Sequence, residues 1–151
     1  MDMEFIRLIR PIVKTNNYKS MKKFNHHKCF STYYHSIKVA YIAYNYAKKH
    51  NLKINIDELV RASLLHDYYL YDWHSKSKWH KFHGFKLPYF ALKNALKEYP
   101  DLTKREKNAI LRHMFPLIPV PPRYEIGWVI TLSDKIAAFS DYRKKRRKKR
   151  L

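Results

Sequence analysis

The scarcity of glycine is the feature that most constrains the fold of this chain. Only Gly84 and Gly127 occur among its 151 residues. A turn-rich β-sandwich needs frequent backbone positions with positive φ, which glycine fills at the lowest steric cost. The sequence therefore disfavours a β-sandwich. The length and a hydrophobic fraction of 46% suffice for one domain with a real core.

Apolar residues recur at helical spacing over most of the chain. Between residues 31 and 49, one stripe at three- and four-residue steps contains His35, Val39, Ile42 and Tyr46. Asn55 to Glu58 and Thr103 to Glu106 each have the form of a capping box, in which an N-cap side chain is answered by an acid three residues later. The second of these helices should reach His113 or Phe115. The sequence therefore predicts an all-α, single-domain helical bundle.

Prolines and aromatic residues mark the remaining boundaries. Pro88 suits the first turn of a helix running to about Tyr99, and a last helix is expected from about Tyr124 to Tyr142. Residues 68–83 are aromatic, basic and without period, which indicates a long loop, and long loops in compact domains are usually functional. Four prolines predict an extended connector before the last helix: Pro116, Pro119, Pro121 and Pro122.

The charge is strongly positive, with 32 basic against 12 acidic residues and a net charge of +20. Eight basic residues form one uninterrupted run, Arg143 to Arg150. We expect residues 1–142 to form the helical domain and residues 143–151 a flexible basic tail. Such a field attracts polyanions, which include RNA, DNA, nucleotides and acidic lipid head groups. A lysine-rich surface that only keeps the protein in solution is the alternative.

The single cysteine, Cys29, cannot form an internal disulfide, which fits a reducing cytoplasm. The first ten residues carry acids and arginines among apolar residues, and no run of 18 uncharged apolar residues occurs. We therefore expect a cytoplasmic protein without a signal peptide or a transmembrane segment.

Several ionisable residues lie on the apolar faces of the expected helices. His35 follows the core stripe of its helix, Asp67 is in line with Leu64, and Asp134 is in line with Ile130. An unpaired buried carboxylate costs on the order of several kcal/mol, and no lysine or arginine falls on these faces. Imidazole and carboxylate are ligands of divalent Mn, Fe, Co, Ni and Zn, so one or two such ions are the economical partner.

The sequence segments around these residues resemble the H…HD…D signature of the HD phosphohydrolase superfamily. His35 lies in TYYHSIKVAYIAY, the pair His66-Asp67 in ASLLHDYYLYDW, and Asp134 in TLSDKIAAFSDY. The similarity continues through HGFKLPYFALKNAL, RHMFPL and PPRYEIGWVI, and spans residues 26–142. The chain is most similar to a small stand-alone, bacterial-type branch of that superfamily.

The resemblance implies a metal held by His35, His66, Asp67 and Asp134. Asp67 bridges to a second metal in branches with two further histidines. His113 matches one of these two histidines. Members of the branch tend to carry the second where this chain has Leu87. His83 or His80 would then have to substitute from the loop.

The function implied is hydrolysis of a phosphate ester or anhydride of a nucleotide or another small phosphorylated molecule. Asp67 and Lys135 are the candidate catalytic residues. Lys81, Arg112 and Arg123 are candidates for binding phosphate. Loop aromatics, among them Tyr68 and Tyr69, would either stack a nucleobase or simply pack the loop. The alternative function is a catalytically degenerate HD protein that binds nucleic acid through its basic surface and tail.

Overall fold

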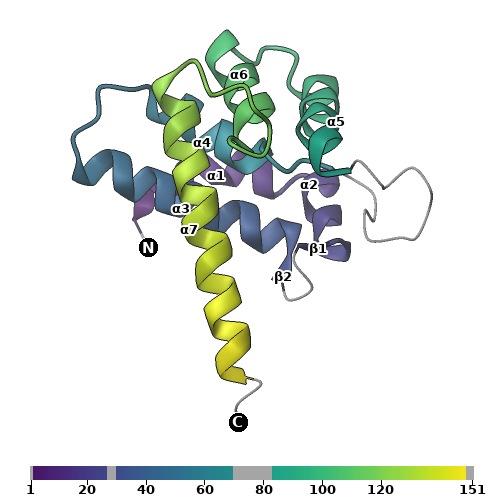
Figure 1. Ribbon diagram of the computed structural model, residues 1–151. Helices are drawn as coiled ribbons and strands as arrows, with labels where there is room; N and C mark the ends of the chain where they lie inside the picture. Colours follow the sequence, from purple (N-terminus) through teal and green to yellow (C-terminus); the bar gives the residue numbers. More distant parts are fainter. Residues whose placement is uncertain (1, 27–29, 70–82, 149–151) are drawn as a thin grey trace.

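The computed structural model describes residues 2–26, 30–69 and 83–148, and the protein is all-α, as predicted (Figure 1). Seven α-helices appear in these ranges: α1 Met3–Val13, α2 Asn16–Ser20, α3 Thr32–Lys49, α4 Ile56–Leu65, α5 His83–Glu98, α6 Lys104–Arg112 and α7 Glu125–Lys148. A 3-10 turn, η1 (Met21–Lys23), precedes two short antiparallel strands, β1 (Asn25–His26) and β2 (Phe30–Ser31). No helix in the described part of the chain is both long and apolar enough to cross a membrane.

The expected helix starts at Asn55 and Thr103 are confirmed by side-chain caps. Asn55 Oδ1 accepts a hydrogen bond of 3.1 Å from the backbone N–H of Glu58. Thr103 and Glu106 form a full capping box, in which each side chain accepts from the other residue's backbone N–H. These bonds satisfy N–H groups that a helix leaves without internal partners, and each such cap stabilises a helix by about 1 kcal/mol.

Other boundaries differ from the prediction. Helix α5 begins at His83, so Pro88 lies inside the helix rather than in its first turn. Helix α7 continues to Lys148, beyond the expected end at Tyr142. Lysine and arginine are good helix formers, and their charges favour the C-terminal end of a helix dipole. The start of the proline-rich connector forms a turn instead of an extended segment, with Leu117 N–H bonded to the Met114 carbonyl at 2.9 Å, and residues 118–124 are irregular.

The core lies where α3 packs against α4 and α7, with α6 packed against both α4 and α7. Helix α3 buries small side chains toward this centre, namely Ala40, Ala43 and Ala47. Such residues let neighbouring helix axes approach closely, and larger side chains from α4 and α7 fill the space, including Leu59, Leu64 and Ile130. In Figure 1, α7 crosses the front of the molecule and its C-terminal half extends beyond the body.

A buried ion pair joins α4 to α6. Glu106 is fully buried, and Arg61 binds it through two hydrogen bonds, Nε to Oε1 at 2.6 Å and Nη2 to Oε2 at 2.8 Å. The remaining guanidinium nitrogen donates to Asp101 Oδ2 at 2.7 Å. Both oxygens of Glu106 are thus satisfied by groups of this chain, the condition for burying a charge without a large penalty.

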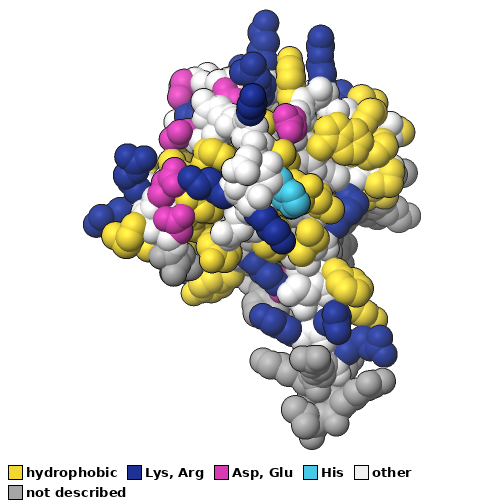
Figure 2. All heavy atoms as spheres, turned by 90° about the vertical axis from the view of Figure 1, so that its left-hand side faces the viewer, with side chains coloured by type: hydrophobic (Ala, Val, Ile, Leu, Met, Phe, Trp, Pro, Cys, Tyr) yellow, Lys and Arg dark blue, Asp and Glu magenta, His cyan; other side chains and the backbone are white. Residues whose placement is uncertain are grey.

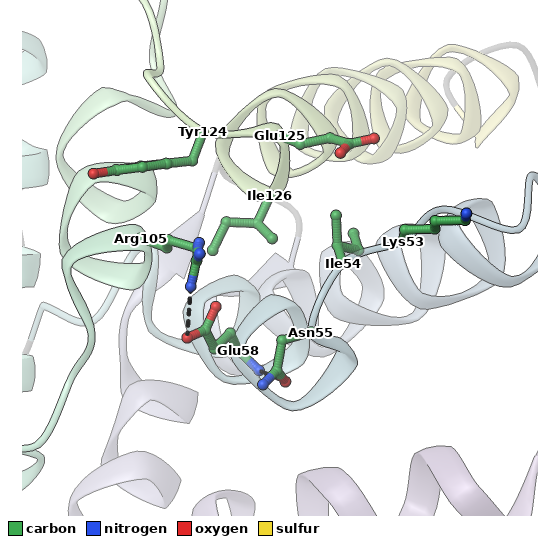
Figure 3. A pocket seen from close by; sticks show the side chains of 8 residues that line it. All are labelled: Lys53, Ile54, Asn55, Glu58, Arg105, Tyr124, Glu125 and Ile126. Atoms are coloured by element: carbon green, nitrogen blue, oxygen red, sulfur yellow. Dashed lines mark hydrogen bonds and ion pairs between the residues drawn. The ribbon is translucent and has the colours of Figure 1, made fainter.

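A cavity of about 330 Å³ lies where α6 and α4 meet the start of α7 (Figure 3). Glu58 and Arg105 face each other across it, with Oε1 and Nη1 3.9 Å apart, and the Tyr124 side chain forms part of its lining. None of its lining residues is one of the predicted metal ligands.

Candidate metal centre

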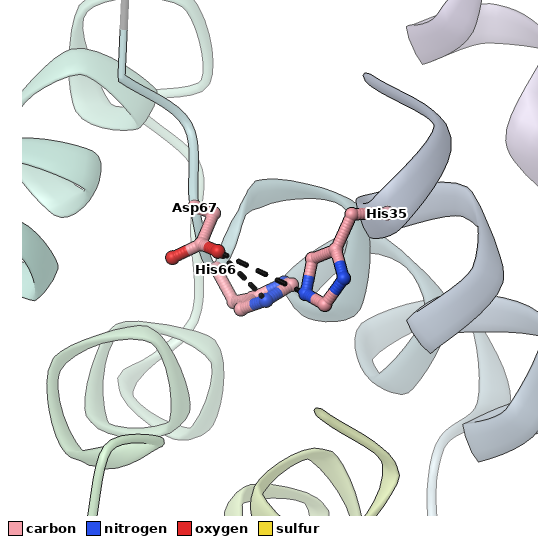
Figure 4. A group of neighbouring side chains, drawn as sticks. All are labelled: His35, His66 and Asp67. Atoms are coloured by element: carbon pink, nitrogen blue, oxygen red, sulfur yellow. Dashed lines mark ion pairs between the residues drawn. The ribbon is translucent and has the colours of Figure 1, made fainter. Parts of the chain in front are cut away.

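Five of the predicted ligands meet in the interior from four different helices. His35 lies in the second turn of α3, His66 is the C-cap of α4 with Asp67 next to it, His113 is the C-cap of α6, and Asp134 lies on the inner side of α7. Figure 4 shows the imidazoles of His35 and His66 turned toward the Asp67 carboxylate. Four of the five residues are at most 3% exposed, and the side chain of Asp134 is 21% exposed.

The side-chain atoms of this cluster face one another at short range. His35 Nε2 lies 2.9 Å from Asp134 Oδ1 and 4.0 Å from Asp67 Oδ2. His66 Nε2 lies 3.4 Å from Asp67 Oδ2, and His113 Nε2 lies 3.5 Å from Asp67 Oδ1. The two oxygens of Asp67 therefore face different histidines.

Backbone carbonyls fix the orientation of two imidazoles. His66 Nδ1 lies 2.6 Å from the Ser63 carbonyl oxygen, and His113 Nδ1 lies 2.8 Å from that of Ile110. A carbonyl oxygen only accepts, so in each ring Nδ1 carries a proton and donates it. In the neutral ring the unprotonated Nε2 then faces the cluster, which is the usual arrangement of a metal-binding histidine.

The carboxylates also control protonation. Burial alone would lower the pKa of His66, but the charges of Asp67 and Asp134 outweigh it and hold that pKa well above its ordinary value. Burial likewise opposes a charge on His35, yet the hydrogen bond to Asp134 raises its pKa. For Asp134, burial would raise the pKa, but the hydrogen bond from His35 and the nearby His66 hold it well below the usual range.

The surroundings of His66 Nε2 indicate whether this cluster fits a cation. His66 Nε2 makes no hydrogen bond with any described residue, although carboxylate oxygens lie 3.4 and 3.7 Å away. Such an atom is costly to bury unless something else binds it. Two overlapping groups have ligand atoms close enough to hold a metal ion: His35, His66 and Asp67, and His66, His113 and Asp134. The donor set thus fits a divalent cation, which would take the place of the protons.

The protein-family comparison agrees with this geometry. The model of the HD domain family matches residues 32–143, about three quarters of the chain, and this range contains all five residues of the cluster. The chain belongs to the HD domain family. HD domains are generally metal-dependent phosphohydrolases. No curated protein and no solved structure matches the chain.

The other predicted site residues are not brought to the cluster by any contact in the described residues. Lys135 Nζ donates to the Phe115 carbonyl at 2.6 Å, and the Arg123 guanidinium packs over the Tyr124 ring at 5.8 Å. Arg112 is half-buried directly before His113. Lys81, His80 and the side chain of His83 lie outside what the structure describes.

The first two aromatic residues of the predicted loop are packing residues. Tyr68 and Tyr69 are fully buried. Tyr68 stacks on Tyr18 with ring centroids 6.0 Å apart, and its hydroxyl donates to Glu98 at 2.7 Å. For these two, the packing alternative replaces nucleobase stacking.

Asp141 is a cluster neighbour that the sequence analysis missed. Its Oδ2 lies 3.9 Å from His35 Nδ1, on the side of the ring away from the other ligands. Lys38 holds it through a hydrogen bond of 2.5 Å to Oδ1. The signal was available, since Asp141 follows Asp134 by seven residues and therefore lies on the same side of α7.

Proposed function

We propose that this HD domain hydrolyses a phosphate ester or anhydride of a small molecule, with nucleotides as the expected substrate class. The observation that carries the proposal is the convergence of three histidines and two aspartates from four helices, with His66 Nε2 making no hydrogen bond to the described part of the chain. Membership of a fold family does not by itself assign an activity. The chemistry of this donor set supports one.

His35, His66, Asp67 and Asp134 are the proposed ligands, and His113 is proposed for a second ion. A divalent ion held there would lower the pKa of a water molecule and offset the charge of a phosphoryl group. The two oxygens of Asp67 face His66 and His113 separately, which supports a bridging role for this carboxylate. Histidine and carboxylate donors suit Mn, Fe, Co, Ni or Zn.

The protein side chains would orient the substrate and exclude water. Asp134 is the most exposed member of the cluster, which supports substrate entry beside α7. The substrate phosphate is proposed to be bound by basic residues of the chain, for which the candidates are Lys81, Arg112, Arg123 and Lys135. Lys135 must then give up its hydrogen bond to the Phe115 carbonyl.

The test is elemental analysis of protein purified without chelator or metal-affinity resin, followed by assays on a panel of phosphate esters. We expect one or two equivalents of metal, with loss of both metal and turnover in Asp67→Ala. Asp57→Ala, at an exposed aspartate of α4, is the matched control and should keep both. Absence of metal after reconstitution, or full turnover in Asp67→Ala, would contradict the proposal.

Nucleic-acid binding by a degenerate HD domain is the second candidate. It is favoured by the exposed Arg143, Lys144 and Arg146 at the end of α7, and by Leu87, which is buried where a ligand histidine was expected. The convergence of five potential ligands weighs against degeneracy. Affinity for RNA that falls steeply with salt, is unaffected by chelator and accompanies inactivity would favour this candidate.

A further inference from the structure

One side of α7 exposes large apolar residues to solvent. Trp128, Leu132, Ile136, Phe139 and Tyr142 are 46, 41, 44, 63 and 59% exposed, respectively. They follow one another at steps of three or four residues, so they share one side of the helix. We refer to these five residues as the α7 outer face. The opposite side of α7 is buried in the core through Ile130 and Ala137.

Basic residues continue the α7 outer face toward the C-terminal end. Arg143 and Arg146 are exposed and recur at the same helical steps. The Arg143 guanidinium lies over the Phe139 ring, 5.9 Å from its centroid. Figure 2 shows hydrophobic and basic side chains next to each other where α7 extends beyond the body. A contiguous apolar surface of this kind marks an interaction site.

We propose that the α7 outer face docks on a lipid bilayer that carries anionic head groups. Exposed apolar and aromatic side chains beside arginine suit the boundary between acyl chains and head groups. Long basic side chains can then reach the head groups while their stems stay in contact with apolar atoms. The two most exposed members, Phe139 and Tyr142, lie on the extended part of α7 and enter first.

Charge favours an anionic bilayer over a second copy of the chain or a nucleic acid as the partner of the α7 outer face. A second copy of the chain also carries a net charge of +20, with Arg143 and Arg146 beside this same face, so two copies repel each other. Duplex nucleic acid would satisfy the basic residues, but its phosphates offer nothing to the five apolar side chains. An anionic bilayer satisfies both kinds of residue at once.

Docking on this face leaves the metal centre intact. Asp134 and Asp141 lie on the inner side of α7, where they contact His35. The proposal is therefore independent of the hydrolase activity and is tested separately.

The first measurement is co-sedimentation of the full chain with phosphatidylcholine vesicles, with and without phosphatidylserine. We expect binding only with phosphatidylserine present, and about a tenfold loss of binding for Phe139→Ser, which removes one large apolar side chain from the membrane. Tyr89→Ser removes an aromatic residue of similar exposure (57%) from α5 and should bind as the wild type does. Circular dichroism of each variant confirms folding.

The second measurement compares two pairs of charge substitutions. Arg143→Gln with Arg146→Gln should weaken binding about fivefold for each charge removed. Lys93→Gln with Lys97→Gln removes the same charge from exposed positions on α5 and should have a much smaller effect. Equal losses from both pairs would mean that only net charge matters and would overturn the proposal.

Two further outcomes would assign the face to another occupant. If Phe139→Ser leaves vesicle binding unchanged but abolishes binding to an RNA oligonucleotide, the face binds nucleic acid. If the wild type ignores both vesicle types and light scattering shows a dimer that Phe139→Ser dissociates, the face binds a second copy. Either result would overturn the lipid proposal.

Discussion

Two of the places where the protein buries carboxylates neutralise them in different ways. Between α4 and α6, Glu106 is paired with Arg61, so that its charge is balanced by a residue of the chain. In the metal centre, the partners described here for Asp67 and Asp134 are imidazoles, which are cationic only when protonated. A permanent cation makes the first group complete by itself. The second group needs protons or a metal ion, which is the difference between a structural ion pair and a binding site.

The largest effect is expected from removing the permanent cation. Arg61→Met should lower the free energy of unfolding by about 3 kcal/mol or more, because it leaves the Glu106 carboxylate buried and unpaired. Metal content should not change. Urea unfolding and elemental analysis measure the two quantities, and Arg7→Met, at an exposed arginine of α1, is the control. Loss of metal without loss of stability in Arg61→Met would contradict the assignment of Arg61 to a structural ion pair.

Adding metal should stabilise only the second group. In metal-free protein, a divalent ion at one hundred times its Kd should raise the free energy of unfolding by about 2.7 kcal/mol. Arg61→Met should gain the same increment, because the two groups are separate, whereas Asp134→Asn should gain little. Thermal unfolding with and without metal is the measurement. An equal gain in Asp134→Asn would place the bound ion elsewhere.

Replacing Asp141, whose carboxylate lies beside His35 Nδ1, should have a smaller effect. Asp141→Asn weakens the orientation of the ring and should lower metal affinity about 10- to 100-fold, the usual effect of losing a partner of a metal-binding histidine. Titration with a competing chelator measures this affinity. Asp57→Asn makes the same chemical change on α4 and should leave the affinity unaltered. An unchanged affinity in Asp141→Asn would show that Asp141 only holds Lys38.

The smallest expected effect is on the pH dependence of stability, through Asp101, the exposed partner of Arg61. The hydrogen bond from Arg61 holds the pKa of Asp101 below its ordinary value of 3.8. A lowered pKa in the folded state contributes stability above pH 3.8, and this contribution is lost as the pH falls through the lower, folded-state pKa. Asp101→Asn should therefore be less stable than wild type near neutral pH, and the difference should vanish in acid. Urea midpoints measured across that range test it.

The sequence predicted the helices with polar caps and apolar stripes, because both signals depend on neighbouring residues. It misplaced the start of α5, where Pro88 was taken as a first-turn residue although the helix begins at His83. Proline fits a first turn best, but it was a weak signal where no N-cap residue confirmed the boundary. Helix α1 was not predicted at all, although Asp2 caps it by accepting from the Glu4 N–H.

The metal ligands could be predicted because buried acids and histidines are conspicuous on apolar faces. Adjacency in sequence was less informative. Lys135 follows Asp134, but successive residues of a helix do not face the same way, and Lys135 is directed to the Phe115 carbonyl instead. A residue's distance from the site depends on packing between helices, which the sequence pattern does not specify.

His66 and His113 are bound by the same kind of contact, a ring N–H donated to the carbonyl three residues earlier in the last turn of a helix. These carbonyls are among those that a helix leaves without partners at its end. Stopping the helix and aiming the ligand are thus one interaction. Copying the side chains alone onto another helical scaffold would therefore leave out part of the centre, since a helix that continued past either position would place a backbone N–H against the carbonyl that orients the imidazole.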